Sequence, residues 1–146
     1  MPEMSDDERA LDRLASERDI RNLIARLAHL ADDGDIDEYL DMWTEDSSWS
    51  AGDGVQHTGR EPRRARVHAH RADGTQGPGT NSRHLNTTLW VAFDDDDHAR
   101  AESYFLYLRD ASTAPHVKMT GRYLDRFRRT PAGWKYDGRQ IVLDVN

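Results

Sequence analysis

Residues 16–33, SERDIRNLIARLAHLADD, carry the strongest helical pattern in the chain. The apolar residues recur every three or four positions: Ile20, Leu23, Ile24, Leu27 and Ala31. At this spacing they form one stripe on an α-helix, while Arg18, Asn22 and Arg26 fall on the other side. We therefore expect a helix that lies across a core and keeps one face in solvent.

Two acids end this helix before Gly34, which is expected to stop it. At about 100° per residue, Asp32 lies about 120° from the middle of the apolar stripe and Asp33 about 140° from it on the other flank. Asp32 is therefore the acid expected at the edge of the interior. The alternative is that both are solvated acids in a last turn, where the helix dipole disfavours negative charge.

Length and composition predict one domain over residues 1–146. The chain has no cysteine, which excludes disulfides and thiolate metal sites. Its formal net charge of -7 argues against general nucleic-acid binding, which needs a basic surface. The start lacks a signal-peptide profile and no apolar run is long enough for a membrane span, so we expect a soluble, cytoplasmic protein without membrane association.

Capping patterns predict three helices before any strand. Ser5 and Glu8 form an S-x-x-E capping box before a short helix, and Ser16 with Asp19 repeats a weaker version before the main helix. Asp35 can cap a third helix. The apolar face of that helix comprises Ile36, Tyr39, Leu40 and Trp43. Residues 47–50, followed by the turn signal AGDG, suit a short strand and a hairpin.

A basic segment covers residues 60–71 and predicts a helix that starts near Pro62. Its arginines could form an anion or nucleic-acid patch, and the H-x-H pair of His68 and His70 could bind a metal. Two histidines without a third ligand at suitable spacing are a weak metal signal, and a basic helix in an acidic protein is more often a solvated face. We therefore favour the solvated face. Residues 72–82 read as a loop that could cover a site.

From residue 83 onwards the pattern changes to β-structure. Four segments rich in aromatic and β-branched residues cover 84–93, 99–109, 117–129 and 133–145. Turns are expected at 94–97, 110–115 and 130–133. The result is a four-stranded antiparallel meander after the helices, which indicates the α+β class.

Two polar residues of these strands are candidates for chemistry. Under strict alternation His84 shares a face with Asn86, Thr88 and Trp90, and Arg139 is in phase with Ile141 and Leu143. An acid, a histidine and an arginine among apolar residues could remove a proton and stabilise an anion. A structural histidine and an ordinary ion-pairing arginine remain the alternatives, because spacing alone does not bring these residues together.

Three segments resemble the SnoaL-like family of the nuclear-transport-factor-2-like superfamily. They are RDIRNLIARLAHLADDGDIDEYLDMWTEDSSW (18–49), NSRHLNTTLWVAF (81–93) and GRYLDRFRRTPAGWKYDGRQIVLD (121–144). The resemblance covers about residues 11–144 and is weakest across 60–81. It implies a cone-shaped, curved antiparallel β-sheet wrapped by three or four N-terminal helices around a deep apolar pocket.

The resemblance is nearest to the dehydratase and dehydrochlorinase branch and implies a catalytic site. The family's catalytic acid falls on Asp32, its histidine on His84, and its arginine, five residues after the tryptophan of the final hairpin, on Arg139. The chain departs from the pattern at Leu27, where many relatives carry a tyrosine, and it shows no counterpart to the second histidine of scytalone dehydratase. Chemistry through two tyrosines and a water is therefore not implied.

On this resemblance we expect a lyase or isomerase in which an Asp–His dyad abstracts a proton from a cyclic hydrophobic substrate, such as a steroid, polyketide or terpenoid. The pocket walls are expected to be Leu27, Trp43, Trp90, Phe105 and Tyr123. Neither a metal nor an organic cofactor is required, and a homo-dimer or homo-trimer is expected. The alternative is a non-catalytic binding or accessory subunit, like the β subunits of ring-hydroxylating dioxygenases.

Overall fold

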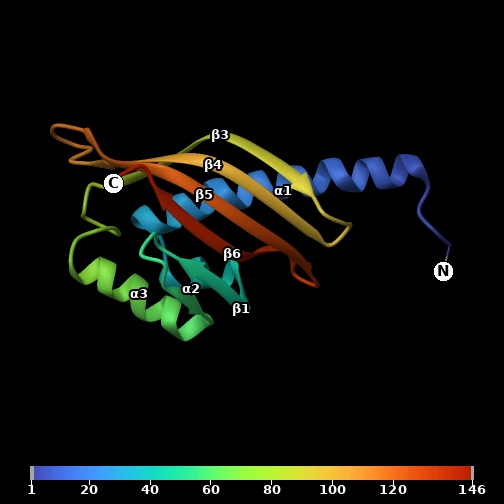
Figure 1. The fold of residues 1–146 in the computed structure, drawn as a ribbon, viewed down its shortest axis with the longest axis horizontal. Coiled ribbons are helices and arrows are strands. Elements are labelled where there is room, and N and C mark those ends of the chain that lie inside the picture. Colours follow the sequence, from blue (N-terminus) through green and yellow to red (C-terminus); the bar gives the residue numbers. More distant parts are fainter. Residues whose placement is uncertain (1, 146) are drawn as a thin grey trace.

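Helix α1 (Asp6–Asp33) is the longest helix and lies along one face of a curved sheet (Figure 1). The computed structural model describes residues 2–145. The predicted capping box is present, with the Ser5 hydroxyl accepting from the Glu8 N–H at 3.2 Å and Glu8 accepting from the Ser5 N–H at 2.8 Å. No helix in the described part of the chain is long and apolar enough to cross a membrane.

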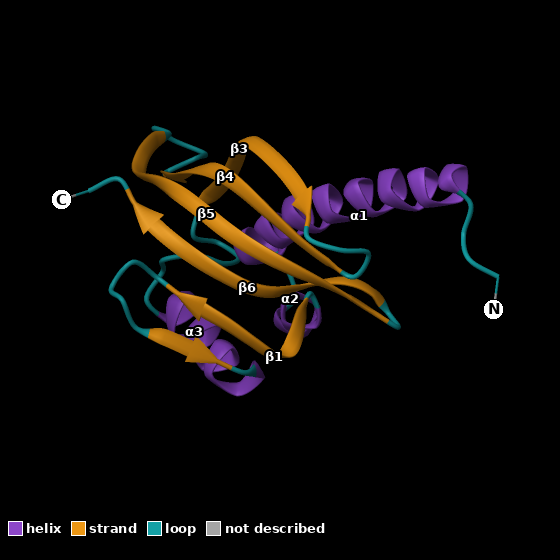
Figure 2. Ribbon diagram, turned by 45° about the vertical axis from the view of Figure 1, so that its right-hand side comes forward, coloured by secondary structure: helices purple, strands orange, loops and turns teal. Residues whose placement is uncertain are grey.

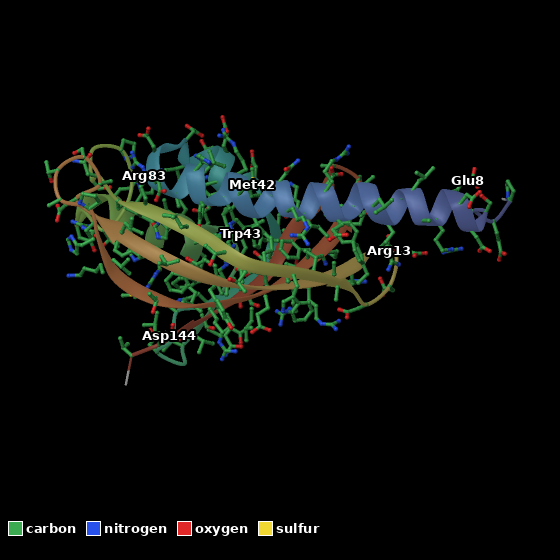
Figure 3. The ribbon with its side chains drawn as sticks, turned by 90° about the horizontal axis from the view of Figure 1, so that it is seen from above. Glu8, Arg13, Met42, Trp43, Arg83 and Asp144 are labelled. Atoms are coloured by element: carbon green, nitrogen blue, oxygen red, sulfur yellow. The ribbon has the colours of Figure 1, made fainter. Side chains whose placement is uncertain are left out.

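The two helices predicted before Gly34 are one continuous helix, which corrects the expected break at Ser16. Ser16 is buried in the middle of α1 and its hydroxyl accepts from Arg129, so it does not cap a new helix. No glycine or proline interrupts residues 6–33, and the strong helix formers Ala, Leu, Arg and Glu recur throughout the segment. The first turns of α1 project past the sheet (Figure 3). Leu11 and Leu14 are exposed, whereas Asp12 and Arg13 beside them contact Arg129 and Phe93 of the sheet.

The predicted apolar stripe of α1 packs on the sheet as expected. Ile20 and Ile24 are almost fully buried and join a core cluster that includes Trp43, Phe127 and Tyr136. Within this cluster the rings of Trp43 and Tyr136 stack with centroids 4.7 Å apart. The helix contacts mainly β3 and β6, so its C-terminal end is held over the inner face of the sheet.

The second helix is shorter than predicted. Helix α2 (Ile36–Asp41) is capped by Asp35, whose side chain accepts from the Glu38 N–H as expected. Trp43 is the first residue of strand β1 (Trp43–Ser50) and not part of a helix, and its ring packs in the core under α1. Two helices, not three, therefore precede the first strand.

The remaining elements follow the predicted order. Strand β2 (Gln56–Thr58) forms a hairpin with β1, and helix α3 (Arg60–Ala72) follows it. The later strands are β3 (Arg83–Phe93), β4 (His98–Arg109), β5 (His116–Thr130) and β6 (Gly133–Leu143).

All six strands belong to one sheet, in the order β2-β1-β6-β5-β4-β3 (Figure 2). The last four form the predicted antiparallel meander. Strand β1 joins the edge of this meander parallel to β6, which makes the sheet mixed. The predicted α+β class is confirmed.

A bulge in β3 changes which side chains face inward. The pairing with β4 shifts between Thr87 and Trp90, and Thr88 has a positive φ of 52°. The extra residue reverses the alternation, so that Leu89 and Val91 pack against the core and Trp90 faces outward. The expectation that His84, Asn86, Thr88 and Trp90 share one face of the sheet is therefore wrong beyond the bulge.

Candidate active site

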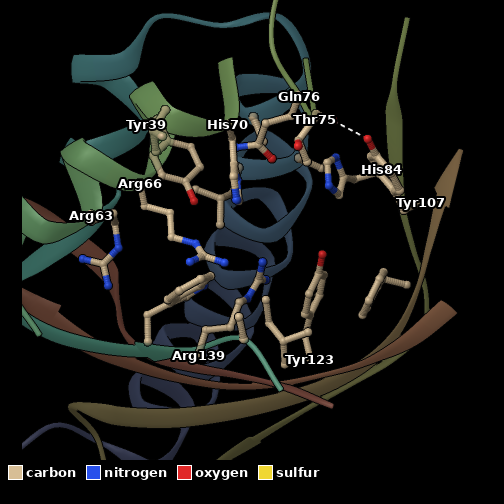
Figure 4. A pocket seen from close by; sticks show the side chains of 18 of the residues that line it. Tyr39, Arg63, Arg66, His70, Thr75, Gln76, His84, Tyr107, Tyr123 and Arg139 are labelled. Carbon is tan, nitrogen blue, oxygen red and sulfur yellow. Dashed lines mark hydrogen bonds between the residues drawn. The ribbon is translucent and has the colours of Figure 1, made fainter. Parts of the chain in front are cut away.

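A cavity of about 290 Å³ lies between the C-terminal end of α1, helix α3 and the inner face of the sheet (Figure 4). Its apolar lining includes Leu27, Ala31, Val67, Met119, Ile141 and Leu143. Polar side chains enter it from α2, α3, β3 and β6. An apolar cavity with a few polar groups is the usual form of a small-molecule site.

The structure brings Asp32 and His84 together at the edge of this cavity. The Asp32 carboxylate accepts from the backbone N–H of His84 at 3.0 Å and lies 2.6 Å from the Nδ1 atom of its ring. Both side chains are well shielded, with 8% of the Asp32 side chain and 16% of the His84 side chain exposed. Asp33 is exposed, so Asp32 is the acid that faces the interior.

This contact determines which nitrogen of the His84 ring carries the hydrogen. A carboxylate only accepts hydrogen bonds, so the pairing favours the tautomer with hydrogen on Nδ1. Nε2 forms no hydrogen bond with residues 2–145, and in this tautomer it carries a lone pair. The arrangement therefore suits a general base whose orientation is set by a neighbouring acid.

The end of α1 that carries Asp32 is held by Arg71 of α3. The Arg71 guanidinium donates to the carbonyl oxygens of Leu30 at 3.2 Å and Gly34 at 2.6 Å. Gly34 has no room for a side chain, because an added Cβ would lie 2.6 Å from the Leu30 Cα atom. The Leu30 carbonyl also accepts from the Gly34 N–H at 2.9 Å, so Arg71 adds a second donor there and supplies positive charge where the helix dipole is negative.

Arg139 lines the same cavity, but its ion-pair partner is Asp125, which does not line the cavity. Its Nε and Nη2 atoms donate to the Asp125 carboxylate at 2.7 and 3.0 Å, and Nη2 also donates to the Tyr136 hydroxyl at 3.2 Å. Burial alone would lower the pKa of Arg139, but the attraction of Asp125 outweighs it and raises that pKa above its ordinary value. Arg139 is therefore a permanent cation, and its Nη1 group is free of these contacts.

Tyrosine hydroxyls also face the cavity. The Tyr123 ring stacks on Phe105 with centroids 4.4 Å apart, and the Arg139 guanidinium lies 3.6 Å from its centroid. Burial raises the pKa of Tyr123 to about 12 and also raises the pKa of Tyr39. Both hydroxyls therefore stay protonated at neutral pH and can donate hydrogen bonds.

The loop that was expected to cover a site borders the cavity. Thr75 and Gln76 line it, and the Tyr107 hydroxyl donates to the Thr75 carbonyl oxygen (Figure 4). Arg109 donates to the Gly74 carbonyl at 2.6 Å. Strand β4 thus holds the loop beside His84.

The structure places three of the five predicted wall residues at the cavity and contradicts two. Leu27, Phe105 and Tyr123 line it. Trp43 does not line the cavity, because its ring packs in the core cluster with Phe127 and Tyr136. Trp90 is 46% exposed on the opposite face of the sheet, because of the bulge in β3.

Helix α3 contributes polar residues that the sequence interpretation missed. Arg63, Arg66 and His70 line the cavity, and Arg63 is only 7% exposed, so the solvated-face interpretation is wrong for this side of the helix. Their spacing of three and four residues, with Val67, is the signal that could have revealed one inward face. Burial lowers the pKa of His70, and the charge of Arg66 lowers it further, so His70 is neutral at pH 7.

Comparison with known proteins agrees with this architecture. The family model of the SnoaL-like domain matches residues 12–140. The search of curated proteins gives no match.

Solved structures show the same fold. A nuclear-transport-factor-2-like protein with a cystatin-like fold from Novosphingobium aromaticivorans is 28% identical, with a TM-score of 0.83 over 99% of this chain and 92% of that one. A candidate scytalone dehydratase from the same organism is 17% identical, with a TM-score of 0.74 over 93% and 89%. LinA is 18% identical, with a TM-score of 0.76 over 94% and 91%. The last two likenesses concern the fold alone.

Proposed function

The chain belongs to the SnoaL-like family, and we propose that it is a cofactor-independent lyase or isomerase that removes a proton from carbon in a small cyclic substrate. The observation that carries this proposal is the hydrogen-bonded contact of Asp32 with His84 at the edge of an apolar cavity. The cavity leaves space for a guest beside the imidazole. A scaffold that only needed the fold would have filled this space with side chains.

In the proposed reaction, Nε2 of His84 takes a proton from a carbon next to a carbonyl group. The electrons of the broken C–H bond form a carbon–carbon double bond and shift negative charge to the carbonyl oxygen. In an elimination, the enolate re-forms the carbonyl and expels a β-hydroxide or β-halide with its bonding electrons, and the imidazolium of His84 then gives its proton to the hydroxide or, when halide leaves, to water. In an isomerisation, the proton returns at the γ carbon. A positioned base of this kind contributes about 10² to 10⁴ in rate.

Asp32 acts as the positioning residue for the base. Its carboxylate holds the imidazole by Nδ1 and by the backbone N–H of the same residue, so the ring cannot rotate away without losing a contact. When His84 takes the proton, the neighbouring carboxylate balances the positive charge of the imidazolium.

Arg139 is proposed to stabilise the charge that develops on oxygen. Asp125 engages one edge of its guanidinium, which leaves the Nη1 group for the substrate. The Tyr123 hydroxyl lies beside it and can donate a second hydrogen bond (Figure 4). Donors fixed in advance in a dry site stabilise an enolate more strongly than water does.

The cavity indicates a compact substrate. Its volume of about 290 Å³ lies at the lower end of the usual range for small-molecule sites, about 300–1,000 Å³. The stacked rings of Phe105 and Tyr123 form a flat surface that suits a ring system. A small polyketide-like or terpenoid-like ketone fits this space better than a large steroid.

The test is turnover of a panel of cyclic β-hydroxy ketones and β,γ-unsaturated ketones, with products identified by mass and chirality. We expect the wild type to convert at least one compound, His84→Ala to lose that activity, and Asp33→Asn, which changes the exposed neighbouring acid, to retain it. Equal turnover by the wild type and His84→Ala would remove His84 as the base.

A further inference from the structure

Two arginines of α3 enter the cavity on the side away from His84. Figure 4 shows Arg63 and Arg66 at one side of the pocket and His84 at the other, with Tyr39 and His70 above the space between them. Each guanidinium lies over a tryptophan ring. The Arg63 Cζ atom is 3.9 Å from the centroid of Trp43, and the Arg66 Cζ atom is 4.3 Å from that of Trp49.

These two arginines lack the acidic partner that Arg139 has. Among residues 2–145, no carboxylate forms a salt bridge with Arg63 or Arg66, and the Nε atom of each is buried without a hydrogen-bond partner. The Arg63 Nη1 atom donates only to the Ser47 hydroxyl, at 2.7 Å. Arg63 is buried and Arg66 is half-buried. A guanidinium shielded from water without an anion is costly, and proteins rarely keep one without a function.

The acid–base properties of Arg63 agree with an unbalanced charge. The pKa of Arg63 is lowered to about 10, chiefly by burial; Tyr39 opposes this change, and the nearby charge of Arg139 adds to it. On the other side of α3, Arg64 has an acidic partner, because its Nη1 atom lies 2.9 Å from the Asp37 carboxylate. Arg63 and Arg66, on the inward face of the helix, therefore lack the carboxylate partner that Arg64 has on the outer face.

We propose that the cavity takes a substrate that carries a carboxylate, and that Arg63 and Arg66 bind this group while the ring extends toward His84. The proposal rests on the proposed function and specifies its substrate as a cyclic keto acid or a comparable ring carboxylate. The positive charge of Arg139 is already balanced by Asp125, and its Nη1 group remains available for the reacting oxygen.

The packing of the two guanidinium groups favours a carboxylate. Stacking on Trp43 and Trp49 occupies their faces and leaves in-plane N–H groups at their edges. Two parallel N–H groups match the two oxygens of a carboxylate. The apolar lining beyond them suits the ring that such an acid carries.

Isothermal titration calorimetry with 2-naphthylacetate, its methyl ester and 2-naphthyl phosphate tests this proposal. We expect the wild type to bind the carboxylate about ten- to hundredfold more tightly than the ester, which has nearly the same shape without charge. Arg66→Met should remove most of this preference and leave binding of the ester unchanged. The thermal midpoint of each variant shows whether it is folded.

Two controls keep the result specific to the site. Arg64→Met removes the same charge from the same helix outside the cavity, and it should leave the affinity for 2-naphthylacetate within about twofold of wild type. If Arg63→Met destabilises the fold, Arg66→Met still decides the question. Equal binding of acid and ester, an equal loss with Arg64→Met, or stronger binding of the phosphate would overturn the carboxylate assignment.

Binding and turnover separate this proposal from the proposed reaction. His84→Ala should retain the preference for the carboxylate, because His84 does not hold that group. A protein that selects the acid without converting any keto acid would retain this binding site while refuting the lyase or isomerase assignment.

Discussion

Asp32 and His84, which are 52 positions apart in the chain, are joined by two contacts of the same carboxylate. Oδ2 accepts from the backbone N–H at 3.0 Å, and Oδ1 lies 2.6 Å from Nδ1 of the ring. The end of α1 and the start of β3 are thereby fixed relative to each other. The acid thus sets both the position of the strand and the orientation of the imidazole.

Asp32→Asn should reduce kcat by about 10² to 10⁴ while the protein stays folded. An amide can offer its NH₂ group to Nδ1, which favours the wrong tautomer of His84 and no longer balances the imidazolium charge. Steady-state kinetics on the compound converted by the wild type measures the effect. Asp33→Asn serves as the control, and a loss of similar size in that variant would indicate a general effect of charge at the helix end.

Asp125→Asn should lower the free energy of unfolding by about 3–5 kcal/mol, because it leaves the buried charge of Arg139 without a partner. Urea denaturation followed by circular dichroism measures this change. Asp37→Asn breaks the exposed pair with Arg64 and should cost no more than about 1 kcal/mol. A cost for Asp125→Asn as small as that for Asp37→Asn would show that the buried pair is not needed.

His70 should make stability depend on pH. Burial and the charge of Arg66 lower the pKa of His70 in the folded protein, so the folded state binds a proton at His70 more weakly than the unfolded state does. Asp73 opposes this shift, and His84 also contributes to it. Above pH 6.5, the ordinary pKa, His70 is neutral in both states and does not weaken the fold. As the pH falls from there through the lower pKa of the folded state, protonation of His70 favours the unfolded state and stability is lost.

His70→Gln should therefore lose less stability than the wild type between about pH 7 and pH 5. Thermal midpoints measured across this range give the comparison. His68→Gln, which changes an exposed histidine of the same helix, should follow the wild type. If all three proteins lose stability in parallel, His70 is not the titrating group.

Much of the fold could be predicted from local patterns. The capping box at Ser5, the cap at Asp35, the turns of the meander and the apolar stripe of α1 depend on neighbouring residues, and all are present. The break predicted at Ser16 is wrong, because a weak capping pattern cannot stop a helix that later packs on a sheet. The β3 bulge at Thr88 has no clear signal in the sequence, so the outward position of Trp90 could not be predicted.

The site was predictable only where family resemblance supplied the long-range contacts. Spacing alone did not bring Asp32 and His84 together. The pairing of Arg139 with Asp125 depends on the register of β5 and β6, in which these residues are directly opposite each other. The inward arginines of α3 were missed because charge composition alone suggested a solvated helix, although the helical spacing of Arg63, Arg66 and His70 fits one face.

Hydrogen–deuterium exchange at carbon tests the central claim most directly, because it detects proton removal without requiring a complete reaction. A ring ketone from the panel would be incubated in D₂O with wild type, His84→Asn or Asp33→Asn, and deuterium at the carbon next to the carbonyl would be followed by NMR. We predict rapid exchange with wild type and Asp33→Asn, and exchange with His84→Asn at the rate seen without protein. Equally rapid exchange with His84→Asn would contradict the role of His84 as the base.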